Sequence, residues 1–199
     1  MNIFQIIALL TWVAFLIYWG LNWKKVKPSK QVKSEFWRFR IIGIFTIALI
    51  IIVTRVFKLV PPCEITWTGC HIYKASQFEF TILDYVGTLL SLTGVMIAIV
   101  ARRTLSTNWS STLDLKEGHE LITKGVYSKV RHPIYTGLML MMIGTMFVFP
   151  TVLEIGIFIA VFVVVAIRIR NEEELMIKTF PKEYPAYKKR TKMLIPFIF

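Results

Sequence analysis

Long apolar runs separated by short polar segments dominate the chain. Residues 1–23 contain no charged side chain, residues 41–60 carry charge only at Arg55 and Lys58, and residues 80–101 carry charge only at Asp84. Each run approaches or exceeds the roughly 20 residues that a helix needs to cross the hydrocarbon core of a bilayer. The pattern therefore predicts three membrane-spanning helices in the first half of the chain.

A fourth apolar run covers residues 133–167 with a single charge, Glu154. As one helix it would be about 52 Å long, whereas the hydrocarbon core is about 30 Å thick. Pro150, followed by Thr151 and Glu154, offers a turn in the middle. We therefore predict a hairpin of two spans joined near Pro150, with the second helix continuing through residues 168–179. The expected fold is an all-α integral membrane protein of about five spans, divided into residues 1–104 (three spans) and residues 105–199 (the core of the site).

The charge balance supports a membrane protein with one strongly basic face. The chain has 199 residues, is 55% hydrophobic and has a formal net charge of +12. Nucleic-acid binding would explain the charge but not the apolar runs, so no nucleic-acid partner is expected. In the five-span arrangement, residues 24–40, 102–131 and 168–199 fall on one side and hold 7, 6 and 8 Lys or Arg, which is 21 of the 24. The positive-inside rule then places the N-terminus outside and the basic face in the cytoplasm, in a prokaryotic plasma membrane or the endoplasmic reticulum.

The two cysteines give little information about the fold or the function. Cys63 and Cys70 are the only two cysteines, which is too few for a disulfide scaffold or a four-cysteine zinc site. Both are expected on the outer side, where a disulfide and two free thiols are both compatible with the sequence.

Residues 118–135, GHELITKGVYSKVRHPIY, form a polar segment with two glycines in a chain that is otherwise mostly apolar. Gly118 and Gly125 permit tight turns. Pro133 opens the next apolar run, and proline is favoured in the first turn of a helix. His132 is therefore expected at a helix N-terminus, where free N–H groups and the helix dipole favour an anionic or polar ligand group. The alternative is a helix-capping loop with surface histidines.

The predicted hairpin returns residues 168–174 to the side of His132. Arg168 and Glu172 are four residues apart, so they share one helix face. Glu172, Glu173 and Glu174 place three like charges in a row, which is unfavourable unless cations neutralise them. One interpretation is a solvated helix end with ion pairs. The other is a pocket in which a carboxylate holds ligand hydroxyls or an ammonium group, beside an arginine that holds a substrate anion.

Two separated motifs resemble a known family. The first is Gly118-His119-x-Leu121-x-x-x-Gly125-x-Tyr127-x-x-x-Arg131-His132-Pro133-x-Tyr135-x-Gly137, preceded by Asn108-Trp109-Ser110. The second is Arg168-x-x-x-Glu172-Glu173, followed by Phe180-x-x-Glu183-Tyr184. In this order and spacing they resemble the isoprenylcysteine carboxyl methyltransferase family, which is related to the membrane phospholipid N-methyltransferases. The resemblance covers roughly residues 105–199, whereas the first two spans match only in hydrophobicity.

The resemblance implies an enzyme that uses S-adenosylmethionine without a Rossmann domain, in agreement with the absence of a Gly-rich strand–helix fingerprint. It implies a cytoplasmic-face cofactor pocket built from the loop before the fourth helix and the helix after the fifth span. The implied cofactor-binding residues are His119, Glu120, Leu121, Ile122, Gly125, Tyr127, His132, Pro133, Ile134, Tyr135 and Glu172, with Glu173 as the carboxylate if the register is off by one. Arg168 would bind the acceptor carboxylate, and Asn108 and Trp109 could line the acceptor pocket.

A metal site is not expected. His119, His132 and Glu172 have ligand chemistry, but no recognised metal spacing joins them. Methyl transfer from a sulfonium to a carboxylate needs neither a metal nor a general base, because the carboxylate is already ionised near neutral pH.

The expected function is methylation of the carboxylate of an isoprenylcysteine-like lipidated acceptor that reaches the enzyme through the bilayer. The nearest alternative is N-methylation of phosphatidylethanolamine, in which Arg168 would meet the phosphate. An alternative of another class is a non-catalytic small polytopic membrane protein. A transport path would require polar residues at mid-membrane in several spans, whereas both motifs lie at one face.

Overall fold

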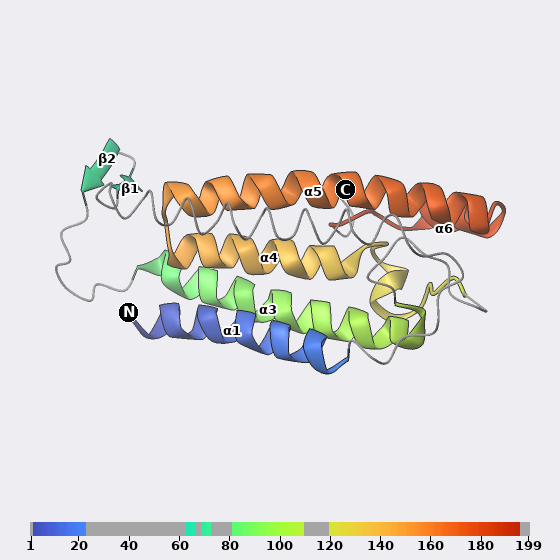
Figure 1. The fold of residues 1–199 in the computed structure, drawn as a ribbon, viewed down its shortest axis with the longest axis horizontal. Coiled ribbons are helices and arrows are strands. Elements are labelled where there is room, and N and C mark those ends of the chain that lie inside the picture. The colour runs from blue at the N-terminus through green and yellow to red at the C-terminus, as the bar shows by residue number, and fades with distance from the viewer. Residues whose placement is uncertain (1, 23–62, 67–68, 73–80, 110–119, 196–199) are drawn as a thin grey trace.

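Four long helices lie side by side in the computed structural model (Figure 1), which describes residues 2–22, 63–66, 69–72, 81–109 and 120–195. They are α1 (Ile3–Leu21), α3 (Ile82–Leu105), α4 (Pro133–Val148) and α5 (Val152–Thr179). Shorter elements are the helix α6 (Glu183–Arg190) and the 3-10 turns η1 (Ser106–Asn108) and η2 (Gly125–Ser128). α3 packs against α1 and α4, and α4 also contacts α5.

The first and third predicted spans are confirmed as helices. α1 and α3 are long and apolar enough to cross a membrane, and α4 is a shorter apolar helix. Large apolar side chains on α1 and α3 face outward, including Leu16 at 64% and Leu89 at 66% exposure. Apolar exposure of this kind indicates a lipid environment. The second predicted span, residues 41–60, lies outside the described residues, so the count of five spans stays a prediction.

The predicted break near Pro150 is confirmed. α4 ends at Val148, and α5 begins at Val152 with Thr151 as its N-cap. The Thr151 hydroxyl accepts a hydrogen bond from the backbone N–H of Glu154 at 3.2 Å, which satisfies one of the free N–H groups of the first turn. α5 then runs without interruption to Thr179, so residues 168–179 continue the same helix, as predicted.

Small residues let α3 and α4 approach closely as an antiparallel pair. A Cβ added at Gly94 would lie 2.5 Å from the carbonyl oxygen of Gly137, and one added at Gly87 would lie 2.6 Å from that of Gly144. The two glycines on each helix are seven residues apart, so they fall on one face of it. In lipid, where helix association depends on van der Waals contact, small residues at an interface allow this close packing. The pair fixes where α4 begins, and therefore where His132 lies.

The prediction of an all-α chain is wrong for one short segment. β1 (Cys63–Thr66) and β2 (Gly69–Ile72) form an antiparallel hairpin, in which Cys63 pairs with Ile72 and Ile65 with Cys70. The segment between the second and third apolar runs is too short and too polar for another spanning helix, and β-branched residues favour the extended backbone. The cysteine side chains lie outside what the structure describes, so both thiol states stay open.

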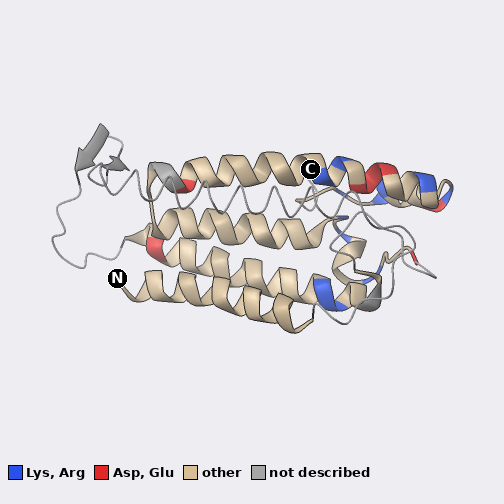
Figure 2. Ribbon diagram, viewed as in Figure 1, with Lys and Arg blue, Asp and Glu red and all other residues tan. Residues whose placement is uncertain are grey.

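Charged side chains gather at the two ends of the bundle (Figure 2). Cations collect where α3 ends and where α5 continues into α6, whereas Asp84 and Glu154 lie in the first turns of α3 and α5 at the opposite end. The apolar faces between the ends carry almost no charge. This arrangement places the polar motifs together at one end of the helices.

Candidate functional site

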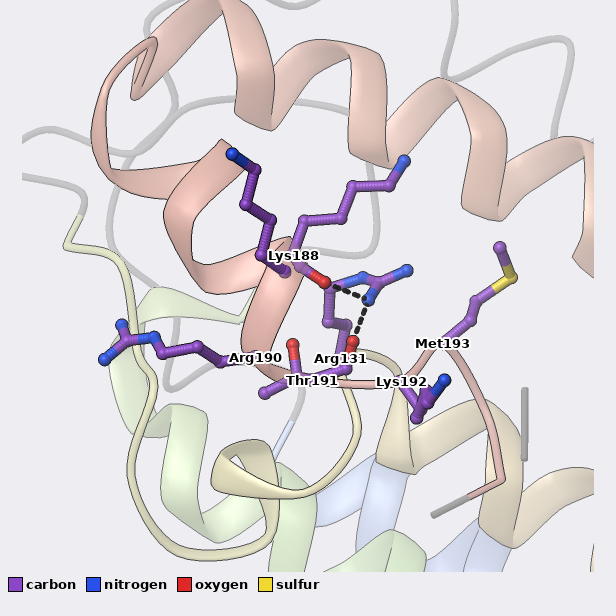
Figure 3. A pocket seen from close by; sticks show the side chains of 7 residues that line it. Arg131, Lys188, Arg190, Thr191, Lys192 and Met193 are labelled. Atoms are coloured by element: carbon purple, nitrogen blue, oxygen red, sulfur yellow. Dashed lines mark hydrogen bonds between the residues drawn. The ribbon is translucent and has the colours of Figure 1, made fainter. Parts of the chain in front are cut away.

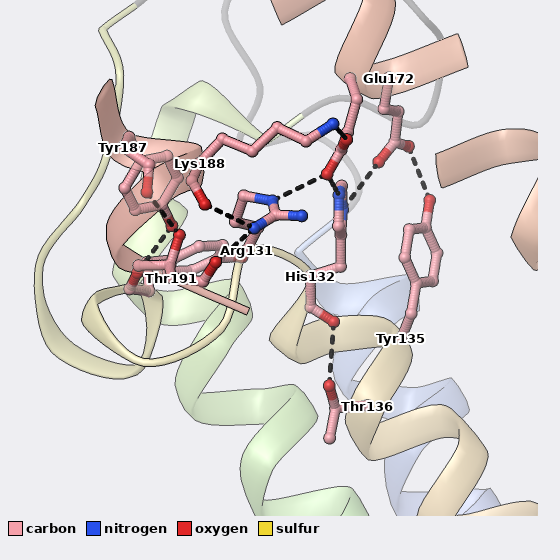
Figure 4. Close-up of polar contacts among 10 residues, drawn as sticks. Arg131, His132, Tyr135, Thr136, Glu172, Tyr187, Lys188 and Thr191 are labelled. Carbon is pink, nitrogen blue, oxygen red and sulfur yellow. Dashed lines mark hydrogen bonds and ion pairs between the residues drawn. The ribbon is translucent and has the colours of Figure 1, made fainter. Parts of the chain in front are cut away.

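His132 and Glu172 meet at the basic end of the bundle (Figure 4). His132 is the residue before α4 and is its N-cap, and Pro133 occupies the first helical position, as predicted. The Nδ1 atom of His132 lies 3.5 Å from Oε2 of Glu172. The hairpin therefore does bring the two motifs, separated by 40 residues of chain, into one site.

Glu172 is the more accessible of the two glutamates in the site. Its Oε1 accepts hydrogen bonds from the hydroxyl of Tyr135 at 2.6 Å and from Nε of Arg168 at 2.9 Å. Its side chain retains 26% exposure. Burial raises the pKa of Glu172, but the contacts with His132 and Arg168 outweigh burial, so the net pKa lies below the ordinary value. Glu172 is thus an ionised carboxylate that is reachable from outside.

Glu173 lies in a closed ion cluster. Its Oε1 accepts from Nε of Arg131 at 2.8 Å, and its Oε2 accepts from Nζ of Lys188 at 2.5 Å. Glu173 is 6% exposed and Arg131 is 9% exposed. Burial raises the pKa of Glu173, and the contacts with His132, Lys188 and Arg131 lower it by more, so the net pKa is well below the ordinary value. Both oxygens are therefore occupied by protein cations.

These contacts explain how three consecutive glutamates are tolerated. Arg168 neutralises Glu172, and Arg131 with Lys188 neutralises Glu173. Sequence reasoning required such cations but gave no role to Arg131 or Lys188. The available signal was the position of Arg131, directly before His132 in the motif. Lys188 gave no signal, because it appears in the sequence as one of several cations in the tail.

The His132 imidazole lies between the two carboxylates. Its side chain is 9% exposed, and Nε2 lies 3.6 Å from Oε1 of Glu173, too far for a hydrogen bond. Nε2 is buried and has no hydrogen-bond partner among the described residues. Burial lowers the pKa of His132, but the two glutamates raise it by more, so the net pKa is above 6.5. The two glutamates therefore favour the protonated form of the ring.

The C-terminal segment after α6 forms hydrogen bonds with the backbone around His132. The backbone N–H of Arg131 donates to the carbonyl of Lys192 at 2.8 Å, and that of His132 donates to the carbonyl of Met193 at 3.1 Å. The hydroxyl of Thr136 donates to the carbonyl of Leu194 at 2.7 Å. Sequence reasoning missed this pairing, because it joins segments about 60 residues apart and residues 191–195 carry no periodic pattern. The tail is therefore part of the site.

The remaining described residues of the first motif lie in the loop before α4 or in the first turn of α4. Gly125 has a φ of 63°, the left-handed conformation expected for a glycine turn. Tyr127 is buried, and its carbonyl accepts a hydrogen bond from the hydroxyl of Tyr187 at 2.6 Å, so α6 covers it. Leu121, Ile122 and Ile134 are partly buried, Pro133 is buried and Glu120 is exposed. His119 lies outside the described residues.

Asn108 and Trp109 lie at the ends of α1 and α3. The guanidinium carbon of Arg102 lies 4.3 Å from the centre of the Trp109 ring, and the Trp19 ring packs edge-on against it. The Oδ1 atom of Asn108 is buried with no partner among the described residues. The assignment of both residues to an acceptor pocket stays a prediction.

Comparisons with known proteins identify relatives of this chain. A family model described as phospholipid methyltransferase matches residues 83–183. The protein-S-isoprenylcysteine O-methyltransferase of Saccharomyces cerevisiae is 36% identical over 116 residues, covering 57% of this chain and 48% of the yeast protein. The enzyme of the same name from Rattus norvegicus is 34% identical over 138 residues, covering 67% of this chain and 48% of the rat protein. The chain thus spans about half the length of these relatives.

A solved structure shares the fold. The eukaryotic intramembrane Ras methyltransferase ICMT, an isoprenylcysteine carboxyl methyltransferase, aligns with a TM-score of 0.58 and 22% sequence identity, covering 96% of this chain and 63% of that chain. The resemblance to isoprenylcysteine carboxyl methyltransferases that the motifs indicate is therefore confirmed. Because the family model matches just over half of the 199 residues, the chain belongs to the phospholipid methyltransferase family.

Proposed function

We propose that this protein is a membrane methyltransferase that uses S-adenosylmethionine to methylate the carboxylate of an isoprenylcysteine-like lipidated acceptor. The observation that carries the proposal is the accessible, ionised Glu172 beside Arg168, placed where apolar helices end. The two kinds of substrate come from different phases, because the methyl donor is soluble and a prenylated acceptor lies in the bilayer. A site at the end of the helices is within reach of both.

The residues fit the cofactor. S-adenosylmethionine supplies an activated methyl group on a sulfonium, and it carries an ammonium, a carboxylate and ribose hydroxyls. Glu172 can accept hydrogen bonds from an ammonium or from hydroxyls, and it is partly exposed. The Nε2 atom of His132 is a donor without a partner in the described chain, which suits an acceptor group on a ligand. Glu173 suits this task less well, because Arg131 and Lys188 already bind both of its oxygens.

The electrostatics favour a carboxylate acceptor over an amine. Phosphatidylethanolamine presents an ammonium group that must lose a proton before it can attack. The pKa of Glu172 is lowered, so this carboxylate is a poor base near neutral pH, and the two glutamates beside His132 favour its protonated form, which cannot accept a proton. A carboxylate needs no base, and orientation by Arg168 with approach in a water-poor site supplies the acceleration. Phospholipid N-methylation, which the description of the family model suggests, remains the second candidate.

The placement in the membrane is part of the proposal. The N-terminus would lie outside, and the site would face the cytoplasm, since the cations gather at its end of the bundle (Figure 2). Within the described residues, no group of three or more His, Cys, Asp or Glu side chains could hold a metal ion. Cofactor binding is therefore proposed to be independent of metal.

The roles of Glu172 and Arg168 are tested by separate substitutions. Loss of a charged hydrogen-bonding partner in a partly dry site costs about 1.5–3 kcal/mol, which is roughly 10- to 150-fold in affinity. Glu172→Gln should weaken S-adenosylmethionine binding, measured by calorimetry, by this factor. Arg168→Ala should retain most of that binding and raise the KM for an anionic acceptor.

The matched control is Glu174→Gln, which removes the same charge from an exposed position on the same helix. It should leave cofactor affinity and turnover unchanged. If Glu172→Gln also leaves cofactor affinity and turnover at wild-type levels and lowers only thermal stability, Glu172 is a helix-end ion pair and the cofactor site lies elsewhere.

A further inference from the structure

A basic cleft lies beside Arg131 (Figure 3). It has a volume of about 350 Å³ and lies between α6 and the C-terminal segment. Five of its seven lining residues are cations, and the other two are Thr191 and Met193. The lining cations are Arg131, Lys188, Lys189, Arg190 and Lys192. The cleft is thus a concave surface with a strong excess of positive charge.

The described residues leave most of this charge unneutralised. Arg131 and Lys188 share the single carboxylate of Glu173. Lys189, Arg190 and Lys192 are exposed, and none of them forms an ion pair within the part of the chain that the structure describes. Like charges this close repel one another unless an anion binds among them. The cleft therefore favours an anionic ligand.

The course of the C-terminal segment places the cleft at the level of lipid headgroups. The segment changes from cations at 188–192 to apolar residues at 193–195, and Ile195 is 49% exposed. The carbonyl of Leu194 accepts a hydrogen bond from Thr136, in the first turn of α4, where the apolar run begins. A cationic stretch followed by an exposed apolar one is typical of a peptide lying at a membrane surface.

We infer that the cleft binds the phosphate of an anionic phospholipid, with Lys189, Arg190 and Lys192 as the main contacts. Arginine and lysine side chains supply several N–H donors to phosphate oxygens. The lipid would hold the C-terminal segment, and with it the backbone of His132, against the membrane. This site is separate from Glu172, which does not line the cleft, and it does not depend on the proposed catalytic activity.

The test uses the full chain purified in a neutral detergent and titrated with short-chain phosphatidylglycerol, short-chain phosphatidylcholine or inorganic phosphate. Phosphatidylglycerol should bind, and its affinity should fall as salt is raised. A lysine or arginine near an anionic headgroup contributes about 1 kcal/mol, or roughly 5-fold in affinity. The triple variant Lys189→Gln, Arg190→Gln, Lys192→Gln should therefore weaken phosphatidylglycerol binding by at least about 10-fold.

The matched control is the triple variant Lys124→Gln, Lys178→Gln, Lys182→Gln, which removes the same charge from exposed lysines outside the cleft. It should bind phosphatidylglycerol like the wild type, and both triple variants should bind S-adenosylmethionine normally. If the first triple variant does not fold, the single variant Arg190→Gln gives the same test with a smaller expected loss of about 5-fold.

Four results would overturn the inference. Equal binding of phosphatidylglycerol and phosphatidylcholine would mean that the cleft does not recognise the anionic headgroup. Inorganic phosphate binding as tightly as phosphatidylglycerol would indicate a site for a soluble phosphate. Equal loss in both triple variants would indicate a nonspecific charge effect. A parallel loss of S-adenosylmethionine affinity in the cleft variant would make the cleft part of the cofactor site.

Discussion

The neighbouring residues Glu172 and Glu173 differ in role because they lie on different faces of α5 and contact different partners. Successive residues on a helix are about 100° apart, so Glu172 faces Tyr135 and Arg168 while Glu173 faces Arg131 and Lys188. Only the first retains an accessible carboxylate. Sequence alone identified the pair but not the division between them, because the partners of Glu173 come from the loop before α4 and from α6.

Glu173 should be required for folding more than for cofactor binding. In Glu173→Gln, Arg131 loses its buried counter-charge, and breaking a buried ion pair typically costs about 3–5 kcal/mol. We expect a large drop in the free energy of unfolding, measured by thermal or denaturant unfolding in detergent. Glu174→Gln, at an exposed position, should change it by less than about 0.5 kcal/mol. Equal stabilities of the two variants would contradict the ion cluster.

His132 should make stability depend on pH in a defined direction. Its pKa is raised above 6.5 in the folded state, so its contribution is complete below pH 6.5 and is lost as pH rises through the raised pKa. The pKa of Glu173 is lowered, so its contribution is complete above pH 4.5 and is lost as pH falls through the lowered pKa. Stability should therefore be highest between these values.

The measurement is the melting temperature of the wild type and of His132→Gln as pH is raised from 6.5. The wild type should lose stability relative to the variant over this range. A constant difference between the two curves would mean that folding does not raise the pKa of the imidazole.

At the level of elements, the close pair formed by α3 and α4 positions the start of α4. The Cβ of Gly137→Ala would lie 2.5 Å from the carbonyl oxygen of Gly94, so the helices must separate. Overpacking of this kind costs about 1–3 kcal/mol. We expect a lower melting temperature for Gly137→Ala, together with weaker cofactor binding because His132 shifts with its helix.

Gly156→Ala is the matched control, because a Cβ at that helical position meets no atom of the described residues within 4 Å. It should preserve or slightly raise stability, since alanine favours the helix more than glycine does. A melting temperature for Gly137→Ala equal to that of Gly156→Ala would show that the contact between α3 and α4 is loose.

Some of these elements could be predicted from the sequence, and others could not. The break at Pro150 and the return of α5 to His132 could be predicted, because both follow from run length against bilayer thickness and from proline chemistry. The β1–β2 hairpin and the pairing of residues 191–194 with the start of α4 could not. Short strands and single backbone bridges depend on their pairing partners elsewhere in the chain. Such pairings produce no periodic pattern of hydrophobic residues in the local sequence.

As a whole, the molecule combines a bundle of apolar helices with a polar site at one end. The apolar runs and the charge asymmetry predicted a membrane protein with its chemistry on the basic side, and the structure gathers the motifs there (Figure 1, Figure 2). The choice of acceptor was not encoded in a motif. It rests on the electrostatics of the site, in which Glu172 is ionised and the raised pKa of His132 favours its protonated form, so an acceptor that is already anionic suits the site best.

The most direct test is transfer of a labelled methyl group from S-adenosylmethionine by the purified protein. The acceptors are N-acetyl-S-farnesylcysteine, its carboxamide, in which the carboxylate is blocked, and phosphatidylethanolamine. The account predicts a base-labile methyl ester on N-acetyl-S-farnesylcysteine and no transfer to the carboxamide. Label appearing in phosphatidylethanolamine, with none in N-acetyl-S-farnesylcysteine, would contradict it.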